Sequence, residues 1–390
     1  MSALRIGTRG SRLALWQANF VADLLRPLAA PRPVEIVEVE TSGDQASDRP
    51  LTEISGEGVF TKEIQRAVLA GTADVAVHSL KDLPTLAVEG LTLAAVPPRG
   101  PVLDVLVSHR HQSFDDLPTG ATVATSSPRR RAQALYRRSD LRLVDIRGNV
   151  ETRLKKMVDQ HLDALLLAQA GMERLGLGKN FLTEPLNPSW MLPAVGQGAL
   201  GLECRADDSD TRSLLEKLED RPTRCAVEAE RALLRALGGG CRVPIGVHSR
   251  IQQDTLHLRG AVLSPDGKWR LEAEGAATPN ESEALGNFVA QELLSQGAQQ
   301  LLNPQRLPHE LIGVGVGLAE NLRMLDVIEV TGRHLPIGFH QANGLQSALA
   351  DVDPPDARLF CHVSCLPTAA KEWSRLAAKT EKSKRRLRRV

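Results

Sequence analysis

The sequence predicts an α/β protein of several domains, with helices on both faces of parallel or mixed sheets. Over the first 200 residues, short apolar runs with the length of buried strands alternate with amphipathic stretches of helical period. Two segments rich in proline and glycine, residues 96–101 and 193–201, divide this region. The chain has 390 residues, more than one domain normally holds, and 42% of them are hydrophobic, so each domain can bury a core.

The elements follow in order from the hydrophobic period. Up to residue 80 we expect strands at residues 4–8, 34–39 and 73–77 and helices at residues 13–24 and 60–70. In the next region we expect strands at residues 122–125, 141–146 and 164–168 and helices at residues 129–137 and 150–159. The alternation of strand and helix is typical of sheets covered on both faces.

Residues 222–302 show a different pattern, in which a helix is followed by strands and a final helix. The expected elements are a helix at residues 223–237, strands at residues 243–250, 256–262 and 269–276, and a turn at residues 264–267. Asn280 and Glu283 resemble a capping box that opens the last helix. This combination predicts a small α+β domain.

We therefore expect four parts. Residues 1–98 and 200–218 form a first lobe, residues 99–199 a second lobe, and residues 219–305 the α+β domain. Residues 306–390 form an extension of unknown role. Its last twenty residues carry nine Lys or Arg and two Glu, and we expect them to be solvated and disordered.

Composition excludes several classes of protein. Aromatic residues make up only 3% of the chain, so a stacking surface for single-stranded nucleic acid is not expected. Five scattered cysteines are typical of reduced thiols in a cytoplasmic protein. No signal-peptide pattern and no apolar run long enough to span a membrane is present in the sequence. Cys361, His362 and Cys365 have the types of zinc ligands but lack a second pair, so no metal is expected.

One arrangement occurs at four places, where an expected strand passes into a helix or turn that carries basic residues. The junctions are Thr8-Arg9-Gly10-Ser11, His78-Ser79-Leu80-Lys81-Asp82, Ser126-Ser127-Pro128-Arg129-Arg130-Arg131 and Ile146-Arg147-Gly148-Asn149 with Arg153. Ser127 is expected to be an N-cap with Pro128 at the first helical position. In open α/β sheets ligands bind beyond the carboxyl ends of the strands, where these junctions fall.

Positive charge at the start of a helix opposes the helix dipole. Three arginines in one first turn are therefore unfavourable unless an anion is present, and a carboxylate fits the guanidinium fork. The alternative is a set of solvated surface arginines. The junctions predict a cleft for a small molecule bearing several carboxylates or phosphates, and the absence of nucleotide-binding glycine motifs disfavours nucleotides.

Two residues have types suited to covalent or proton-transfer chemistry. Cys241 follows three glycines and precedes Arg242, which favours the thiolate, although a small buried cysteine is the alternative. Asp82 lies just past a buried strand beside Lys81, and an ionised carboxylate in a cleft can stabilise a cation or relay a proton. The alternative for Asp82 is a surface aspartate paired with Lys81.

These residues resemble the motifs of the hydroxymethylbilane synthase (porphobilinogen deaminase) family. The matching segments, which extend in order over about residues 4–302, are residues 8–17, 77–84, 125–130, 147–154, 192–199 and 239–246. The resemblance implies two lobes like those of periplasmic binding proteins and a third domain that carries the cofactor. It also implies a cytoplasmic, monomeric transferase of heme (porphyrin) biosynthesis, which condenses four porphobilinogen molecules and releases hydroxymethylbilane.

The resemblance further implies the site residues. The cofactor, a dipyrromethane, is joined by a thioether to Cys241, and the acid/base aspartate is Asp82. The implied cofactor-binding residues are Lys81, Ser127, Arg129, Arg130 and Gly148. The implied substrate-binding residues are Arg9, Ser11, Gln17, Phe60, Arg147, Arg153, Arg174 and Gln197.

Two features depart from the family pattern. The loop before Phe60 carries Glu53 and Glu57, with Glu where many members have Lys, and residues 306–390 extend past the usual end of the family. From the residues alone, a two-lobed protein that binds carboxylates without catalysis is the competing function. A third domain with Cys241 is the feature that such a protein does not need.

Overall fold

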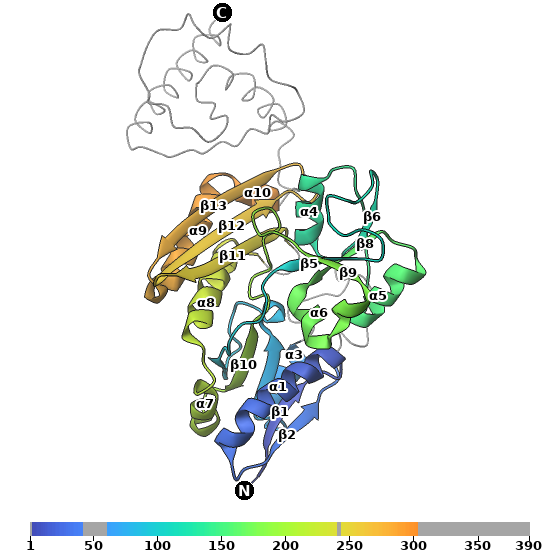
Figure 1. Cartoon of the computed structure of the whole chain (residues 1–390). Coiled ribbons are helices and arrows are strands. Elements are labelled where there is room, and N and C mark those ends of the chain that lie inside the picture. Colours follow the sequence, from blue (N-terminus) through green and yellow to red (C-terminus); the bar gives the residue numbers. More distant parts are fainter. Residues whose placement is uncertain (1, 42–60, 240–242, 303–390) are drawn as a thin grey trace, which may run out of the picture. The chain divides into compact units, whose positions relative to one another are not determined.

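The computed structural model describes residues 2–41, 61–239 and 243–302, which contain three β-sheets (Figure 1). The first sheet has the order β2-β1-β3-β10-β4. Its strands are β1 (Leu4–Thr8), β2 (Val34–Glu38), β3 (Val75–Ser79), β4 (Leu91–Ala95) and β10 (Leu200–Arg205). β1 is parallel to β2 and β3, whereas β10 is antiparallel to β3 and β4, so the sheet is mixed.

Helices cover both faces of this first sheet. They are α1 (Arg12–Ala29), α3 (Lys62–Leu69) and α7 (Ser209–Glu216). Val75 and Val77 of β3 belong to the same buried cluster as the apolar side of α1, whereas Ala76 packs with Ile64 and Val68 of α3. Successive side chains of a strand point to opposite faces, so the first three residues of β3, Val75 to Val77, must all be apolar. We call the sheet with these helices the first lobe.

The second sheet repeats this arrangement with the order β7-β6-β8-β5-β9. Its strands are β5 (Asp104–Ser108), β6 (Thr122–Ala124), β7 (Arg142–Val144), β8 (Ala164–Ala168) and β9 (Leu182–Pro185), and its helices are α4 (Pro128–Arg137), α5 (Val150–Asp159) and α6 (Gln169–Leu175). Leu166 shares a cluster with Ala134 of α4, and Leu165 packs with Met157 of α5. This sheet and its helices form the second lobe.

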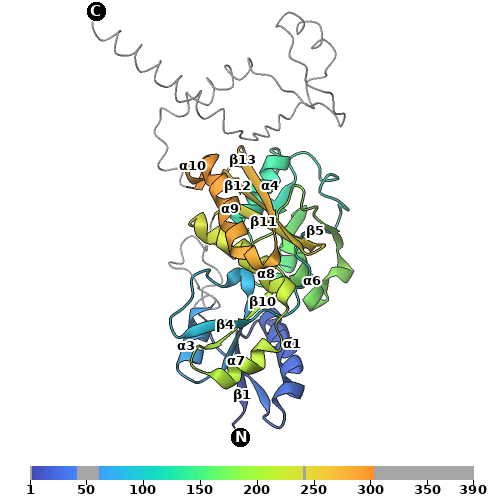
Figure 2. The same ribbon diagram turned by 90° about the vertical axis from the view of Figure 1, so that its left-hand side faces the viewer.

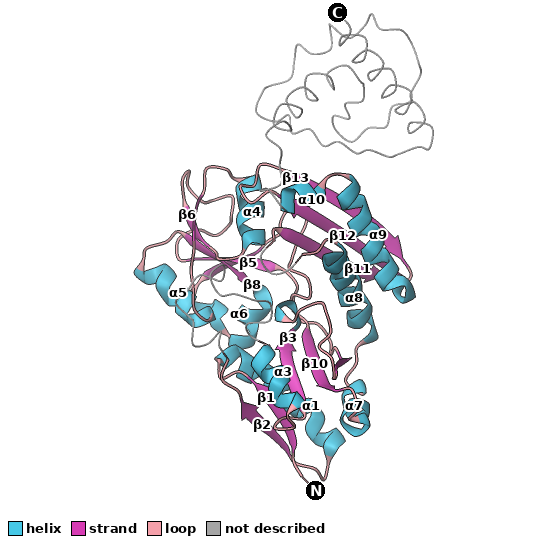
Figure 3. Ribbon diagram, turned by 180° about the vertical axis from the view of Figure 1, so that it is seen from behind, coloured by secondary structure: helices cyan, strands magenta, loops and turns pink. Residues whose placement is uncertain are grey.

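The third sheet is an antiparallel meander, β11 (Ile245–Gln252), β12 (Thr255–Leu263) and β13 (Arg270–Ala277). The helices α8 (Arg221–Ala236) and α9 (Ser282–Ser295) lie side by side against it, as Figures 2 and 3 show, and α10 (Ala298–Leu302) follows. Leu233 of α8, Leu258 of β12 and Val289 of α9 share one buried cluster. The predicted α/β class, with two lobes of mixed sheets and a small α+β part, is confirmed.

The expected start of the last helix is wrong by two residues. The capping box consists of Thr278 and Glu281, which open a short 3-10 turn before α9. The Asn280 and Glu283 pair has the right spacing, but Glu283 binds Arg235 of α8 at 2.9 Å instead. A tertiary ion pair therefore takes the side chain that the local pattern assigns to a cap.

The chain passes between the two lobes twice, before β5 and after β9. The two passages touch backbone to backbone, since the amide of Gly100 donates to the carbonyl of Gly198 at 3.1 Å. Gly198 has φ of +84°, and a Cβ there would lie 2.6 Å from the carbonyl oxygens of Gly100 and Pro101. Only glycine fits this contact. The domain boundaries expected from the sequence stay a prediction, which the membership of the three sheets supports.

Candidate active site

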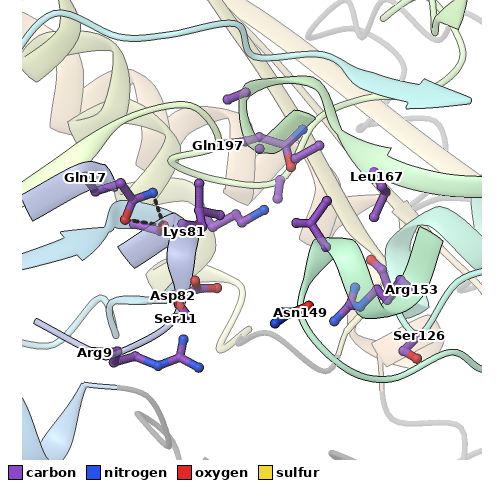
Figure 4. A pocket seen from close by; sticks show the side chains of 18 of the residues that line it. Arg9, Ser11, Gln17, Lys81, Asp82, Ser126, Asn149, Arg153, Leu167 and Gln197 are labelled. Atoms are coloured by element: carbon purple, nitrogen blue, oxygen red, sulfur yellow. Dashed lines mark hydrogen bonds between the residues drawn. The ribbon is translucent and has the colours of Figure 1, made fainter. Parts of the chain in front are cut away.

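A cavity of about 870 Å³ lies where strands of both lobes end. Its walls follow the carboxyl ends of β1 and β3 in the first lobe and of β6 and β8 in the second. Figure 4 shows side chains from both lobes around it. Every predicted site residue that the structure describes lines this cavity: Arg9, Ser11, Gln17, Lys81, Asp82, Ser127, Arg129, Arg130, Arg147, Gly148, Arg153, Arg174 and Gln197. Phe60 and Cys241, like Glu53 and Glu57, lie outside the described residues.

Three helices begin at the cavity, and each is capped by a side chain of the predicted junctions. Ser11 caps α1, Ser127 caps α4 and Asn149 caps α5. The predicted N-cap at Ser127, with Pro128 in the first turn, is confirmed. A capped N-terminus leaves further amide hydrogens and the positive end of the helix dipole facing the cavity, which favours anions there.

The turn before α5 depends on a glycine. Gly148 has φ of +113°, and a Cβ at this position would lie 2.6 Å from Cγ2 of Thr152. The Gly148 carbonyl accepts a hydrogen bond from Nε of Arg153 at 2.8 Å. The turn therefore fixes the guanidinium of Arg153, and Figure 4 shows this side chain among those that surround the cavity.

Arg129 and Arg130 bind an anion within the protein, which the sequence argument did not foresee. The carboxylate of Asp104, which is 0% exposed, lies 2.5 Å from Nη1 of Arg129 and 2.8 Å from Nη2 of Arg130. Arg129 also donates to the carbonyl of Leu192 at 2.6 Å, and Arg130 to that of Leu166 at 3.1 Å. The premise that only a bound ligand makes these arginines favourable is therefore wrong, because Asp104 supplies the compensating charge.

The two arginines keep the carboxylate of Asp104 ionised. Burial alone would raise the pKa of Asp104, but the positive charges of Arg129 and Arg130 outweigh burial and hold it well below its usual range. The sequence carried a sign of this cluster, since Asp104 begins the apolar strand β5. A lone charged residue at the start of a buried strand indicates an internal partner.

Three other arginines of the cavity have no carboxylate partner among the described residues: Arg147, Arg153 and Arg174. Burial lowers the pKa of all three, to about 10 for Arg153, where Arg130 and Arg147 add to the effect. Arg174 is oriented by the Gly198 carbonyl, 2.6 Å from its Nη2, and by the Trp16 ring beneath it. A ligand carboxylate would offset the cost of holding these charges away from water.

Lys81 and Asp82 lie together at the end of β3, on a single 3-10 turn, Leu80–Asp82. Figure 4 shows the two side chains extending in different directions. Asp82 lines the cavity and its charge acts on Lys81, so its role stays a prediction. Burial lowers the pKa of Lys81 to about 8, although the charge of Asp82 counteracts part of this effect.

Residues before and after the glycine-rich segment that precedes Cys241 also line the cavity. Leu234 of α8 and Val243 before β11 contribute to its wall. Lys156 of α5 is a further cationic lining residue that the sequence analysis did not select. Lys156 lies three residues after Arg153, so both are expected on one side of the helix. This spacing is also common for lysines that face solvent, so it did not single out Lys156.

The comparisons with known proteins agree with this geometry. Residues 4–213 match the family model described as "Porphobilinogen deaminase, dipyromethane cofactor binding domain", and residues 224–295 match "Porphobilinogen deaminase, C-terminal domain". The porphobilinogen deaminase of Syntrophotalea carbinolica is 47% identical over 301 residues, which cover 77% of this chain and 95% of that protein. The porphobilinogen deaminase of Shouchella clausii is 48% identical over 307 residues, which cover 78% of this chain and 98% of that protein.

The chain belongs to the porphobilinogen deaminase family. The resemblance inferred from the motifs is thereby confirmed. Among solved structures, the VFT2 domain of BvgS from Bordetella pertussis covers 56% of this chain and 86% of that domain, with 15% identity and a TM-score of 0.34. This likeness is too weak to add to the topology described above.

Membership in the porphobilinogen deaminase family decides between the two functions that the residues left open. It supports the synthase and not the carboxylate-binding protein without catalysis. The described residues contain no cluster of ligands that could hold a metal ion, and Cys361, His362 and Cys365 lie outside them. Among the same residues, no helix has the length and apolar character needed to cross a membrane.

Proposed function

We propose that this chain is a hydroxymethylbilane synthase. It deaminates four porphobilinogen molecules, joins them head to tail on a covalently bound dipyrromethane, and releases linear hydroxymethylbilane by hydrolysis. The observation that carries the proposal is the cavity between the strand ends of the two lobes. It combines eight basic side chains with the carboxylate of Asp82 in a chain of the porphobilinogen deaminase family.

The cations suit the charge of the substrate. Each pyrrole bears an acetate and a propionate, so a growing chain accumulates carboxylates. We propose that Arg9, Arg147, Arg153 and Arg174, with Ser11 and Gln17, bind carboxylates or rings of the substrate. Guanidinium groups bind carboxylates in bidentate fashion, and these hydrogen bonds gain strength where burial lowers the local dielectric.

The cavity also fits the cofactor. Lys81, Ser127, Arg129, Arg130 and Gly148 line the same cavity as Leu234 and Val243, which lie on either side of Cys241 in the sequence, and we propose that they hold the dipyrromethane. When bound through the Cys241 thioether, this group supplies the pyrrole to which the first substrate is joined. Arg129 and Arg130 keep donors for a ligand because Asp104 and two carbonyls use only part of their five N–H groups each.

We propose Asp82 as the acid/base residue. Its carboxylate can stabilise positive charge on a substrate ring after ammonia leaves, and it can accept the proton that a ring carbon loses when two rings join.

We also propose the division of the chain that the sequence predicts. The first lobe comprises residues 1–98 and 200–218, the second lobe residues 99–199, and the cofactor-attachment domain residues 219–305. We further propose a monomeric state and a cytoplasmic location.

The direct test is intact-mass measurement of the purified protein, together with incubation with porphobilinogen. We expect an added mass equal to a dipyrromethane and formation of a linear tetrapyrrole. An unmodified chain that consumes no porphobilinogen would contradict the proposal.

Replacement of Cys241 by Ser is expected to leave a folded protein without cofactor. A hydroxyl is a far poorer nucleophile than a thiolate at neutral pH, so the thioether cannot be replaced by an ether at a useful rate. Intact mass should show the bare chain, and turnover should fall to background. Cys204 and Cys225 are buried, and Cys225→Ser serves as the matched control that keeps the added mass. Normal turnover by Cys241→Ser would remove this residue from the function.

The pKa of Lys81 predicts a pH dependence of carboxylate binding. In the cofactor-free Cys241→Ser protein, the side chain of Lys81 is positively charged below about pH 8 and loses this charge as the pH rises. Its affinity for a pyrrole dicarboxylate should therefore fall with rising pH. The expected loss approaches tenfold between pH 7 and pH 9 if the bound carboxylate keeps Lys81 protonated. Lys81→Arg stays charged and should show a flat profile by titration calorimetry. A decline of equal size in Lys81→Arg would assign the effect to another group.

A further inference from the structure

Gln197 presents a buried acceptor that receives no hydrogen bond from any described residue. Its side chain is 0% exposed and lines the cavity. The amide nitrogen donates to the carbonyl of Val102 at 2.8 Å and to Oδ1 of Asp104 at 3.0 Å. Among the described residues, no group hydrogen-bonds the amide oxygen, Oε1. A buried acceptor without a donor costs free energy, so it indicates a ligand that supplies one.

The orientation of this amide is fixed by its neighbours. Val102 offers a carbonyl oxygen and Asp104 a carboxylate, and both groups are acceptors only. Turning the amide over would place Oε1 against these two oxygens and lose both hydrogen bonds. The nitrogen must therefore face Asp104, and the oxygen must face the other way. In Figure 4 the oxygen of Gln197 points toward the side where Lys81 extends.

The backbone of Gln197 is held equally firmly. Its carbonyl accepts a hydrogen bond from Nε of Arg99 at 2.8 Å, and its amide donates to the carbonyl of Ala194 at 3.0 Å. Arg99 is paired with the buried carboxylate of Glu230, which also accepts from the amide of Gly196 at 2.7 Å. These contacts prevent Gln197 from moving to satisfy Oε1 elsewhere, so the acceptor is prearranged for a ligand.

The surroundings select the kind of donor. Porphobilinogen carries two, the ammonium of its aminomethyl group and the N–H of its ring. Lys81, Arg129 and Arg130 also line the cavity, and Asp104 balances only one of their three positive charges, so the remaining charge disfavours the substrate ammonium beside them. The ring N–H is neutral, so these positive charges do not repel it. A ring whose carboxylates bind these cations therefore meets Oε1 through its nitrogen.

We propose that Oε1 of Gln197 accepts a hydrogen bond from the N–H of a pyrrole ring bound in the cavity, and that this contact selects pyrroles and orients the ring relative to Asp82. The inference rests on the proposed function, since it takes porphobilinogen as the substrate. It adds recognition of the ring itself to recognition of the carboxylates. Asp104 is then shared by the arginines and Gln197, which links the two kinds of contact.

The test uses the cofactor-loaded enzyme and two unreactive inhibitors. Both carry the acetate and propionate of porphobilinogen and a methyl group in place of the aminomethyl group. One is a pyrrole, and the other is the furan with ring oxygen in place of N–H. In the wild-type enzyme the furan should inhibit about tenfold more weakly, as expected for the loss of one hydrogen bond to a buried acceptor.

Two variants assign this preference to Gln197. Gln197→Met has no acceptor, so the ratio of the two inhibition constants should fall at least fivefold. Gln197→Glu keeps an oxygen toward the cavity whether or not the carboxyl is protonated. It should therefore retain the preference for the pyrrole even if both inhibitors bind more weakly. Loss of the hydrogen bond to Asp104 alone should weaken the binding of both inhibitors equally and leave the ratio of their inhibition constants unchanged. A change in this ratio therefore reports on Oε1 alone.

Three results would overturn the inference. An unchanged ratio in Gln197→Met would show that Oε1 does not bind the ring N–H. Equal inhibition of the wild type by pyrrole and furan, which requires no variant, would show that ring N–H is not recognised. A raised KM for porphobilinogen in Gln197→Met with unchanged inhibition by both analogues would assign Oε1 to the ammonium. In each case the wild type still assembles tetrapyrrole, so failure of the proposed function, seen as no consumption of porphobilinogen, is a separate outcome.

Discussion

Asp82→Asn is expected to lower turnover by roughly 10²–10⁴ while the protein still folds and binds pyrrole carboxylates. Asparagine preserves the shape of the side chain but has neither its charge nor a usable proton affinity. Both proposed tasks of Asp82, stabilising a cationic ring and accepting a proton from a ring carbon, therefore fail together. The cations that bind carboxylates are unchanged, so the loss should appear in kcat more than in KM.

The measurement is a single-turnover assay that follows ammonia release and ring coupling separately. Asp82→Glu keeps the charge but places it one methylene further, so it should retain more activity than Asp82→Asn. An active Asn variant would remove Asp82 from the mechanism. A purely structural role of Asp82 instead predicts near-normal turnover in both variants.

The outline of the fold was predictable because it depends on local signals. β3 lies between α1 and α3 and is buried on both faces, which gives a continuous apolar run. The N-cap at Ser127 followed by proline is equally local. The start of α9 was misassigned because Thr278 and Asn280 offer competing caps, and the ion pair between Arg235 and Glu283 depends on the packing of α8 against α9.

The cavity was predictable because basic residues follow the carboxyl ends of β1, β3, β6 and β7, at the four junctions named in the sequence. The partners of these residues were not predictable, since Asp104 is 25 residues from Arg129 and 93 residues from Gln197 in sequence. Only the second sheet, with β5 beside β8, brings them together. Motifs therefore identified groups that line the cavity, while the buried groups that hold them needed the tertiary structure. This distinction changes what is expected when Arg129, Arg130 or Asp104 is replaced.

Asp104→Asn is expected to lower the free energy of unfolding by about 3–5 kcal/mol, because it leaves two buried guanidinium groups without a compensating charge. The matched control is Asp145→Asn. Asp145 pairs with Arg131 of the same helix at 3.2 Å but is 75% exposed, so its loss should change stability by less than about 0.5 kcal/mol.

The pH dependence of the difference in unfolding free energy between wild type and Asp104→Asn tests whether the charge of Asp104 causes this difference. The folded-state pKa of Asp104 lies below its unfolded value, so the stabilisation is complete well above the unfolded pKa of about 3.9 and is lost as the pH falls toward the folded value. Denaturant titrations should therefore show the full gap between wild type and Asp104→Asn at pH 7 and a smaller gap below about pH 4. A gap that persists unchanged at low pH would point to packing instead of charge. Added pyrrole dicarboxylate should restore part of the stability of Asp104→Asn at pH 7, since a ligand carboxylate can then compensate the arginines that Asp104 normally pairs.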